Sequence, residues 1–292
     1  QNSTINTYQK TGLVAWGPKL DVDILNNHIT GVGIHGVSNQ NGMQIGSANA
    51  DRAGTTGTVS GNTFDGLDTV SPVYSATAVV LRQSGSVTVE NNSVSSARSA
   101  ETNQTYGVIV FEGNTPVTIR NNTFTNLNLG VNVSSPWGTI GSSSHTISGN
   151  NFNSTYYAVY DDDNGAVNPL TVSVNSSATV SNSRGYLDYI LLDGNDSFTD
   201  TGAAPSHIDG GTGDDTIVTG SGADQLTGGT GNDTLTGGTG ADIFIYAATG
   251  DGVDTITDFG TGDLIRVTGR ASTGGTVTVG DGTTVAANSI QL

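Results

Sequence analysis

The chain contains no cysteine in its 292 residues, which excludes a disulfide framework and any zinc or iron–sulfur site with cysteine ligands. Basic residues are also scarce, with 9 Lys and Arg against 26 Asp and Glu, and the formal net charge is −17. Such a chain has no basic patch for a phosphate backbone, so we expect no nucleic-acid partner. No apolar run reaches the roughly 18 residues of a membrane span. The sequence therefore predicts no transmembrane segment and no conventional leader peptide in these residues.

The negative charge is concentrated in one part of the chain. Fourteen of the 26 acidic residues are Asp residues between Gly185 and Ile265, and this stretch contains no Lys, Arg or Glu. Carboxylates at this density repel one another in a compact fold. We therefore expect this part to be poorly folded until bound cations neutralise it.

A nine-residue repeat occupies the middle of the acidic stretch. Its four copies begin at Gly210, Thr219, Gly228 and Gly237, and each has Gly at the fourth place, Asp at the sixth and an apolar residue at the eighth. Nine residues are enough for one tight turn and one short strand, so two copies complete a coil and residues eighteen apart stack. We expect Asp215 over Asp233 and Asp224 over Asp242. The apolar residues expected to point inward are Ile217, Leu226, Leu235 and Phe244.

This spacing favours a calcium site. Glycine permits positive φ in the turns and lets backbone carbonyls converge near the repeated Asp, and Ca²⁺ accepts about six to eight oxygen ligands in irregular geometry. A disordered Gly/Asp linker would not keep an apolar residue in nine-residue phase. We expect Thr219 in place of the first Gly to be a mild change. The candidate calcium-site residues are Asp196, Gly211, Gly213, Asp214, Asp215, Gly222, Asp224, Gly229, Gly231, Asp233, Gly238, Gly240 and Asp242.

The repeat resembles the calcium-binding nonapeptide of RTX, or haemolysin-type, proteins. The resemblance extends from about Leu191 to Val267, because Gly194 to Phe198 reads as a degenerate copy and Asp254 to Ile265 resembles the segment that caps RTX β-rolls. It implies a parallel β-roll that holds several Ca²⁺ ions. It also implies a bacterial protein exported by a type I secretion system to the cell surface or the extracellular space. The tail from Gly274 to Leu292 resembles the export signal of such proteins.

A longer repeat precedes the roll. Apolar residues flank an Asn-containing turn at steps of 35, 30, 30 and 28 residues, starting from Ile24. Short β-branched strands and a variable period near thirty predict the stacked coils of a parallel β-helix. The turn asparagines are expected to form an internal ladder, because Asn tolerates a left-handed backbone and its amide can bond the equivalent Asn one coil away. They are Asn27, Asn62, Asn92, Asn122 and Asn150.

These patterns together predict an all-β chain with three parts. We expect a right-handed parallel β-helix over residues 1–186, a calcium-binding parallel β-roll with its capping segment over 187–268, and C-terminal strands with a type I secretion signal over 269–292. The β-helix part resembles pectate-lyase-like proteins. Its first residues, Gln1 to Thr7, lack a polar cap. We therefore expect either a larger parent product or end-to-end self-assembly.

A β-helix followed by an RTX roll resembles the layout of secreted mannuronan C5-epimerases. Their Asp-Pro-His-Glu signature is absent here, so the sequence leans away from an enzyme and assigns no catalytic residue. We expect a secreted structural or adhesive protein whose folding and assembly depend on Ca²⁺. The alternative is a uronan epimerase or lyase, or the non-catalytic C-terminal part of one.

One aromatic and acidic cluster is a candidate for contact with an extracellular polysaccharide or a further cation. The plain alternative is a solvated loop at the end of the β-helix. The cluster contains Tyr156, Tyr157, Tyr160, Asp161 and Asp163.

Overall fold

The structure is a computed structural model of the chain. It describes residues 2–8, 11–18, 20–31, 39–46, 54–68, 75–82, 84–97, 104–111, 116–134, 145–153, 155–162, 170–174, 186–191, 194–246, 250–268, 276–279 and 284–286. All regular elements within these ranges are β-strands, and they form three sheets, which we name A, B and C. Every pair of neighbouring strands is parallel except β28 and β29, which pair antiparallel.

Sheet A comprises β1 (Thr4–Tyr8), β4 (His28–Gly31), β7 (Thr63–Asp65), β10 (Ser93–Ser95), β13 (Thr123–Thr125) and β16 (Asn151–Asn153). Sheet B comprises β2 (Thr11–Ala15), β5 (Gln40–Gly46), β8 (Ala76–Arg82), β11 (Thr105–Phe111), β14 (Leu129–Ser134), β17 (Tyr157–Asp162), β19 (Leu187–Ile190), β21 (Ser206–Thr212), β23 (Gln225–Thr230), β25 (Ile243–Tyr246) and β27 (Leu264–Val267). Sheet C comprises β3 (Asp21–Leu25), β6 (Thr56–Ser60), β9 (Val87–Glu90), β12 (Thr118–Arg120), β15 (His145–Ser148), β18 (Leu170–Val174), β20 (Ser197–Asp200), β22 (Thr216–Val218), β24 (Thr234–Thr236), β26 (Val253–Ile256), β28 (Thr276–Val279) and β29 (Thr284–Ala286).

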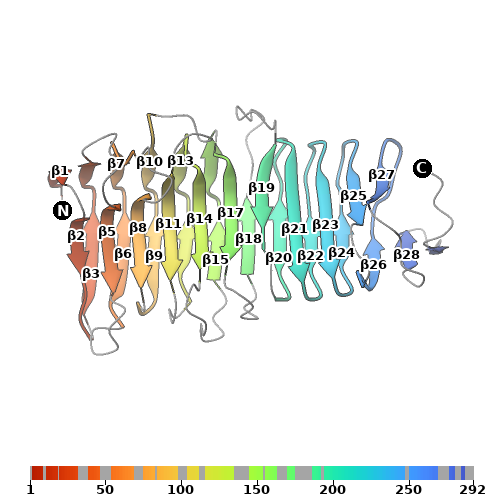
Figure 1. Ribbon diagram of the computed structural model, residues 1–292, viewed down its shortest axis with the longest axis horizontal. Coiled ribbons are helices and arrows are strands. Elements are labelled where there is room, and N and C mark those ends of the chain that lie inside the picture. The colour runs from red at the N-terminus through yellow and green to blue at the C-terminus, as the bar shows by residue number, and fades with distance from the viewer. Residues whose placement is uncertain are drawn as a thin grey trace.

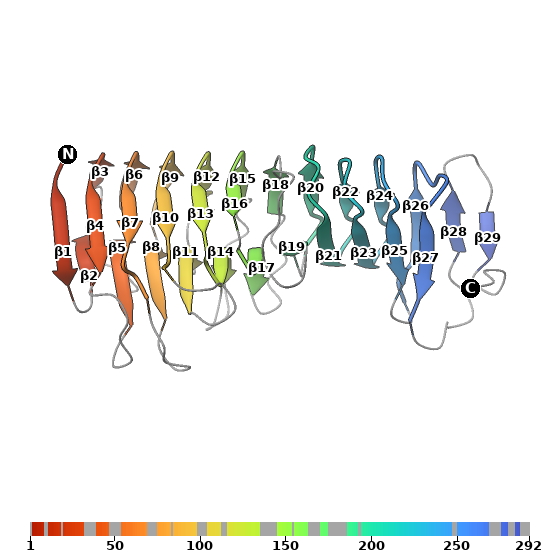
Figure 2. The ribbon, with the colours of Figure 1, turned by 90° about the horizontal axis from the view of Figure 1, so that it is seen from above.

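The coils change from three strands to two along the chain. From β1 to β16 the chain passes through sheets A, B and C in turn, whereas from β18 to β28 the described strands alternate between sheets B and C (Figure 1). Figure 2 shows the strands of sheet A confined to the red-to-green half of the molecule. The predicted parallel β-helix and β-roll are therefore confirmed as a fold class. Because sheets B and C continue through both, the two parts form one elongated solenoid, and the boundary at residue 186 stays a prediction.

A continuous apolar column fills the interior of the solenoid. In the two-strand part, Ile217 pairs in register with Leu235, and Leu226 pairs with Phe244, as residues eighteen apart should. All four are completely buried. A row of this kind removes apolar surface from water in every coil, and each coil depends on its neighbours for that burial.

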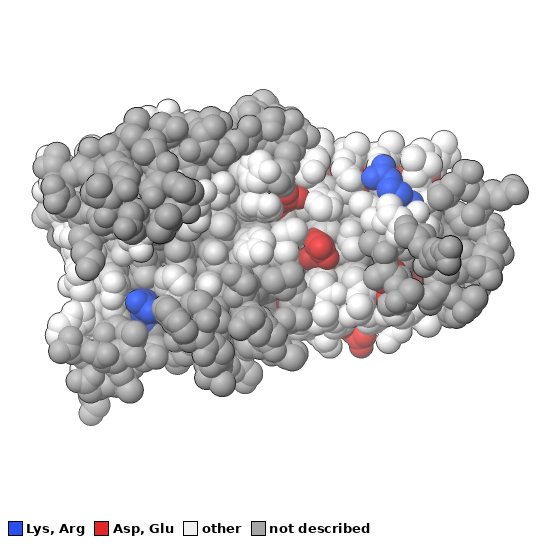
Figure 3. All heavy atoms as spheres, in the orientation of Figure 1, with Lys and Arg blue, Asp and Glu red and all other residues white. Residues whose placement is uncertain are grey.

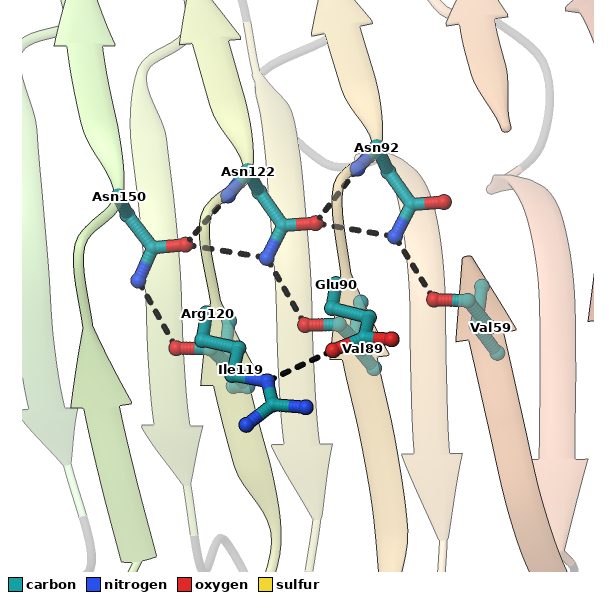
Figure 4. A network of polar contacts seen from close by, with 8 residues as sticks. All are labelled: Val59, Val89, Glu90, Asn92, Ile119, Arg120, Asn122 and Asn150. Carbon is teal, nitrogen blue, oxygen red and sulfur yellow. Dashed lines mark hydrogen bonds and ion pairs between the residues drawn. The ribbon is translucent and has the colours of Figure 1, made fainter. Parts of the chain in front are cut away.

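The predicted asparagine ladder is present and buried (Figure 4). The side-chain oxygen of Asn122 accepts hydrogen bonds from the backbone N–H and from Nδ2 of Asn92, at 3.0 and 2.9 Å. The Nδ2 of Asn92 also donates to the carbonyl of Val59 at 2.9 Å. The same bonds join Asn27 to Asn62, Asn62 to Asn92 and Asn122 to Asn150. Each amide is therefore satisfied within the fold.

One detail of the ladder differs from the expectation. The ladder asparagines do not have left-handed backbone themselves; the residue before each of them does, with φ between 55° and 69°. These residues are Asn26, Gly61, Asn91, Asn121 and Gly149. The left-handed residue turns the chain so that the following Asn side chain points into the coil interior, where its hydrogen bonds lie.

Candidate metal centre

The repeated Asp residues form two buried columns, one in each set of turns. The first column lies where the chain passes from sheet B to sheet C and contains Asp196, Asp215 and Asp233 in the turns and Asp254 at the start of β26. The second lies in the turns from sheet C to sheet B and contains Asp224, Asp242 and Asp263. We call these turns the first and second edges of the roll. All but Asp263 are at most 3 % exposed.

Within each column, Oδ1 of one Asp accepts the backbone N–H of the residue one coil earlier. Asp215 donates its N–H to Oδ1 of Asp233 at 2.8 Å, and Asp224 donates to Oδ1 of Asp242 at 2.9 Å. The two predicted stacks are therefore present. The N–H of Asp196 and the N–H of Ser206 begin the columns, donating to Asp215 and Asp224.

The second carboxylate oxygen is in a different situation. Oδ2 of Asp215, Asp224, Asp233 and Asp242 is buried in each case and accepts no hydrogen bond. Burying an oxygen of a carboxylate without a partner is costly, because the lost hydration is not replaced. The protein alone therefore does not satisfy these four oxygens, whereas a bound cation would give each of them a partner.

The asparagine ladder gives a direct comparison, because it uses the same Oδ1 bond to the N–H one coil earlier. In the ladder, the second side-chain atom is an Nδ2 that donates to a carbonyl, such as that of Val59 for Asn92. In the columns, the second atom is an oxygen and cannot donate. The β-helix therefore satisfies its ladder internally, whereas the roll presents an extra acceptor in the turns of Asp215, Asp224, Asp233 and Asp242.

Turn glycines let the carbonyls of successive coils approach closely. Six of the seven predicted turn glycines have positive φ, between 83° and 158°. They are Gly211, Gly213, Gly229, Gly231, Gly238 and Gly240. Gly222 has no positive φ, but a Cβ there would lie 2.6 Å from the carbonyl oxygen of Ala204. A side chain at any of the other six positions, Gly211 apart, would meet backbone of the preceding coil.

The first glycine of three repeat copies has a role that the sequence pattern did not reveal. Gly210, Gly228 and Gly237 do not have positive φ, yet a Cβ at any of them would lie only 2.2–2.6 Å from Oδ2 of the Asp five residues later. At Gly237 that separation from Oδ2 of Asp242 is 2.6 Å. At Gly210 the same place also lies 2.6 Å from the carbonyl oxygen of Gly228, so two oxygens face one small space.

Burial raises the pKa values of the column carboxylates. The pKa of Asp215, Asp224 and Asp254 is raised from 3.8 to about 7, chiefly because desolvation disfavours the charged form. The pKa values of Asp233 and Asp242 are raised for the same reason. Backbone N–H donors and neighbouring carboxylates act in opposite directions in each case. The metal-free columns are therefore poorly suited to hold several charges near neutral pH.

The structure adds members to the columns that a nine-residue search misses. Asp254 and Asp263 accept the N–H of Asp233 and Asp242, at 2.9 and 3.0 Å. Their separation is 21 residues instead of 18, and only the resemblance of this stretch to a capping segment pointed to them. Asp258 accepts the N–H groups of Gly237 and Gly238, at 3.0 and 2.7 Å.

Asp214 lies outside the buried columns. Its N–H donates to the side-chain oxygen of Asn195, and its own Oδ1 accepts the N–H of Asn232 at 2.8 Å, both at the exposed surface.

On the face shown in Figure 3, most of the described surface belongs to uncharged residues. Among the described residues, no group of three or more His, Asp or Glu side chains is arranged to hold a metal ion. The turns instead present single carboxylates beside backbone carbonyls.

The predicted sugar-binding cluster is assembled only in part. The rings of Tyr156 and Tyr157 meet edge to face at 4.9 Å, and those of Tyr157 and Tyr160 at 5.6 Å. Asp161 lies in β17, and Asp163 lies outside the described residues. The next two strands of sheet B carry a separate His207–Asp188 pair, with Nδ1 and Oδ1 2.6 Å apart, and the ring of Tyr186 lies 5.6 Å from that of His207.

Comparison with known proteins gives one match. Residues 208–244 match the family model for the RTX calcium-binding nonapeptide repeat, in four copies. The match covers the four turns whose carboxylates and glycines are described above. A search of curated proteins and a search of solved structures found no match. No helix in the described part of the chain is long and apolar enough to cross a membrane.

Proposed function

Since the chain contains RTX calcium-binding nonapeptide repeats, which bind Ca²⁺, we propose that it is a secreted structural or adhesive solenoid whose roll folds only with calcium. The observation that carries this proposal is the set of buried Oδ2 atoms of Asp215, Asp224, Asp233 and Asp242, which accept no hydrogen bond. Ca²⁺ supplies the missing partner, because it binds carboxylate and carbonyl oxygens together. Calcium binding is then coupled to folding of the turns.

The proposed ligands are the column carboxylates together with turn carbonyls. Asp196, Asp215, Asp233, Asp224 and Asp242 provide the carboxylates, and Asp254 and Asp263 extend the two columns. The turn glycines hold the carbonyls in place. Asp214 is exposed and bonded to its neighbours, so we assign it to the rim of the site.

The β-helix and the roll differ in whether their buried side chains require an ion. Its asparagine ladder needs no ion, because the Nδ2 atoms supply the donors that the roll lacks. We therefore propose that the β-helix is the part that folds without calcium and that the roll is completed in the calcium-rich medium outside a cell. Extracellular calcium modules commonly bind in the range of about 10⁻⁴ to 10⁻³ M.

Assembly into filaments or layers is the finer part of the proposal. The coil of β1, β2 and β3 exposes Val14, Trp16 and Leu20, with exposed fractions of 50, 43 and 38 %. A second copy stacked on this coil would cover those side chains and extend the parallel sheets. Stacking of this kind gives an open fibre when the contact is heterologous.

The experiment is a calcium titration of the metal-stripped chain, followed by far-ultraviolet circular dichroism and by light scattering on the same sample. The proposal predicts a gain of β signal with Ca²⁺ and none with an equal concentration of Mg²⁺, because Mg²⁺ demands stricter octahedral geometry. A rise in scattering together with the β signal supports assembly. A full β signal before any calcium is added would contradict the coupling of folding to calcium.

A polysaccharide-binding function is the second candidate, and the packed rings of Tyr156, Tyr157 and Tyr160 favour it. Aromatic side chains with polar tips suit the apolar face and hydroxyl groups of a sugar. Binding of uronan oligosaccharides to the calcium-loaded chain, weakened by Tyr157→Ala, would support this candidate. Unsaturated or epimerised uronate products would instead support the enzymatic alternative.

A further inference from the structure

The two edges of the roll differ at one position, the first residue of the repeat. On the first edge, Gly210 and Gly228 leave room for the Oδ2 atoms of Asp215 and Asp233. On the second edge, the second copy has Thr219 at this position, followed five residues later by Asp224. Thr219 is 4 % exposed, so its side chain lies inside the turn.

The Thr219 hydroxyl lies beside a backbone carbonyl that corresponds to the one facing Gly210. At Gly210, the carbonyl oxygen of Gly228, one coil on, faces the place where a Cβ would be. At Thr219, the hydroxyl Oγ1 lies 2.8 Å from the carbonyl oxygen of Gly237, one coil on, and 3.2 Å from that of Thr236. The side chain thus occupies the equivalent space and provides a donor to the equivalent carbonyl.

We propose that the Thr219 side chain replaces one calcium ion on the second edge, so that the two edges of the roll bind calcium unequally. This inference rests on the proposed function. A hydroxyl proton satisfies one carbonyl at no cost in charge, whereas a calcium ion at that level would need both the volume of the Thr219 side chain and the Gly237 carbonyl. The site at Gly210, Asp215 and Gly228 keeps both free for the ion.

On this proposal the change from Gly to Thr alters how many ions the turn holds, whereas the sequence alone predicted a mild change. Backbone geometry does not require glycine at this repeat position, because Gly210, Gly228 and Gly237 all lack positive φ. What glycine provides there is space. Thr219 removes that space at one level of the second edge only, since the next level on that edge has Gly237.

The experiment counts calcium ions bound to the full chain, by equilibrium dialysis with native mass spectrometry, for the wild type and three variants. Thr219→Gly restores the residue of the other copies and should bind one ion more than the wild type. Thr219→Val keeps the volume without the hydroxyl and should gain no ion. The reciprocal variant, Gly210→Thr, should bind one ion fewer.

The outcomes separate the two proposals. A wild type that binds calcium together with a Thr219→Gly variant of the same stoichiometry and affinity would overturn this inference and leave the proposed function standing. A wild type that binds no calcium would overturn both. Thr219→Gly places at this position the residue found in the three other copies. The number of calcium ions that it binds therefore tests the proposal even if Gly210→Thr does not fold.

Discussion

At the scale of single residues, the roll and the β-helix use one hydrogen bond in common. An Oδ1 atom accepts the N–H of the residue one coil earlier, at 2.8–2.9 Å for Asp215 to Asp233 and for Asn27 to Asn62. The second atom of the same amide or carboxylate group determines whether the protein alone satisfies the side chain. An amide nitrogen closes the network within the protein, and a carboxylate oxygen leaves an acceptor for an ion. This difference lets each half be tested by exchanging one atom.

Asp233→Asn should reduce calcium affinity but stabilise the metal-free roll, because an amide keeps the Oδ1 acceptor for Asp215 and carries no charge. Asp233→Ala should reduce calcium affinity and also leave the buried N–H of Asp215 unpaired, at a cost of about 1–3 kcal/mol. Calcium binding by calorimetry and metal-free urea unfolding near pH 5, where protonated column carboxylates stabilise the roll, separate the two effects. Equal metal-free stability of the two variants would contradict the role given to Oδ1.

Asn92→Asp is the converse exchange in the β-helix. The new Oδ2 would face the carbonyl of Val59 and the side-chain oxygen of Asn122, which now accept hydrogen bonds from Nδ2. A buried charge without a partner costs about 3–5 kcal/mol. Urea unfolding at pH 8 should show a larger loss for Asn92→Asp than for the control Asn92→Ala. A loss no greater than that of the control would argue against a tightly satisfied ladder.

At the scale of turns, glycine has two separable functions, backbone conformation and close approach between coils. Gly231 and Gly250 both have positive φ, 140° and 106°. A Cβ on Gly231 would collide with the carbonyl oxygen of Gly213, whereas a Cβ on Gly250 meets nothing within 4 Å. Gly250→Ala is therefore a control for backbone strain alone.

Gly231→Ala should destabilise the calcium-loaded roll by more than Gly250→Ala, for which conformational strain predicts a cost of about 1–2 kcal/mol. The reason is that Gly231→Ala also separates two stacked turns. Thermal unfolding in saturating calcium measures both variants. Similar melting temperatures would mean that the close approach of Gly231 to Gly213 adds nothing beyond the shared backbone strain.

The turns also determine how the roll responds to pH. The pKa of Asp215, Asp224 and Asp254 is raised from 3.8 to about 7 in the metal-free fold, so the fold binds more protons than the unfolded chain between these values. The metal-free roll should gain stability as the pH falls from about 7 toward 4. Calcium affinity should fall over the same interval, because protons and calcium compete for the carboxylates.

Circular dichroism of metal-stripped protein and calcium titrations, both between pH 8 and pH 5, measure these two opposite trends. The same titrations on Asp215→Asn should show a weaker pH dependence, because one titrating group is absent. Calcium affinity that stays constant across the interval would show that the column carboxylates do not exchange protons for calcium.

The periodic features of these turns were predictable from the sequence, and the non-periodic ones were not. Strict spacing of nine predicted that Asp215 stacks on Asp233, and a period near thirty predicted the ladder through Asn92. Asp254 breaks the nine-residue count, and the function of Gly210 depends on which oxygen lies above it. Such contacts between coils follow from side-chain placement, which residue spacing alone does not determine.

At the scale of the whole molecule, continuous sheets join two parts of the solenoid that differ in their proposed requirement for calcium. Sheets B and C run through both parts, so the β-helix offers β17 and β18 as a template on which β19 and β20 pair. Repeat proteins fold by adding units to existing neighbours. Calcium should therefore extend an already folded β-helix rather than start a separate domain.

The most direct test of this account is hydrogen exchange of the full chain, measured by mass spectrometry with and without calcium. Amides of β21 to β25 should exchange quickly in metal-free buffer and become protected when calcium is added. Amides of β6 to β16 should be protected in both conditions. Equal protection of β21 to β25 without calcium would show that the roll satisfies its buried carboxylates unaided and that its folding does not depend on calcium.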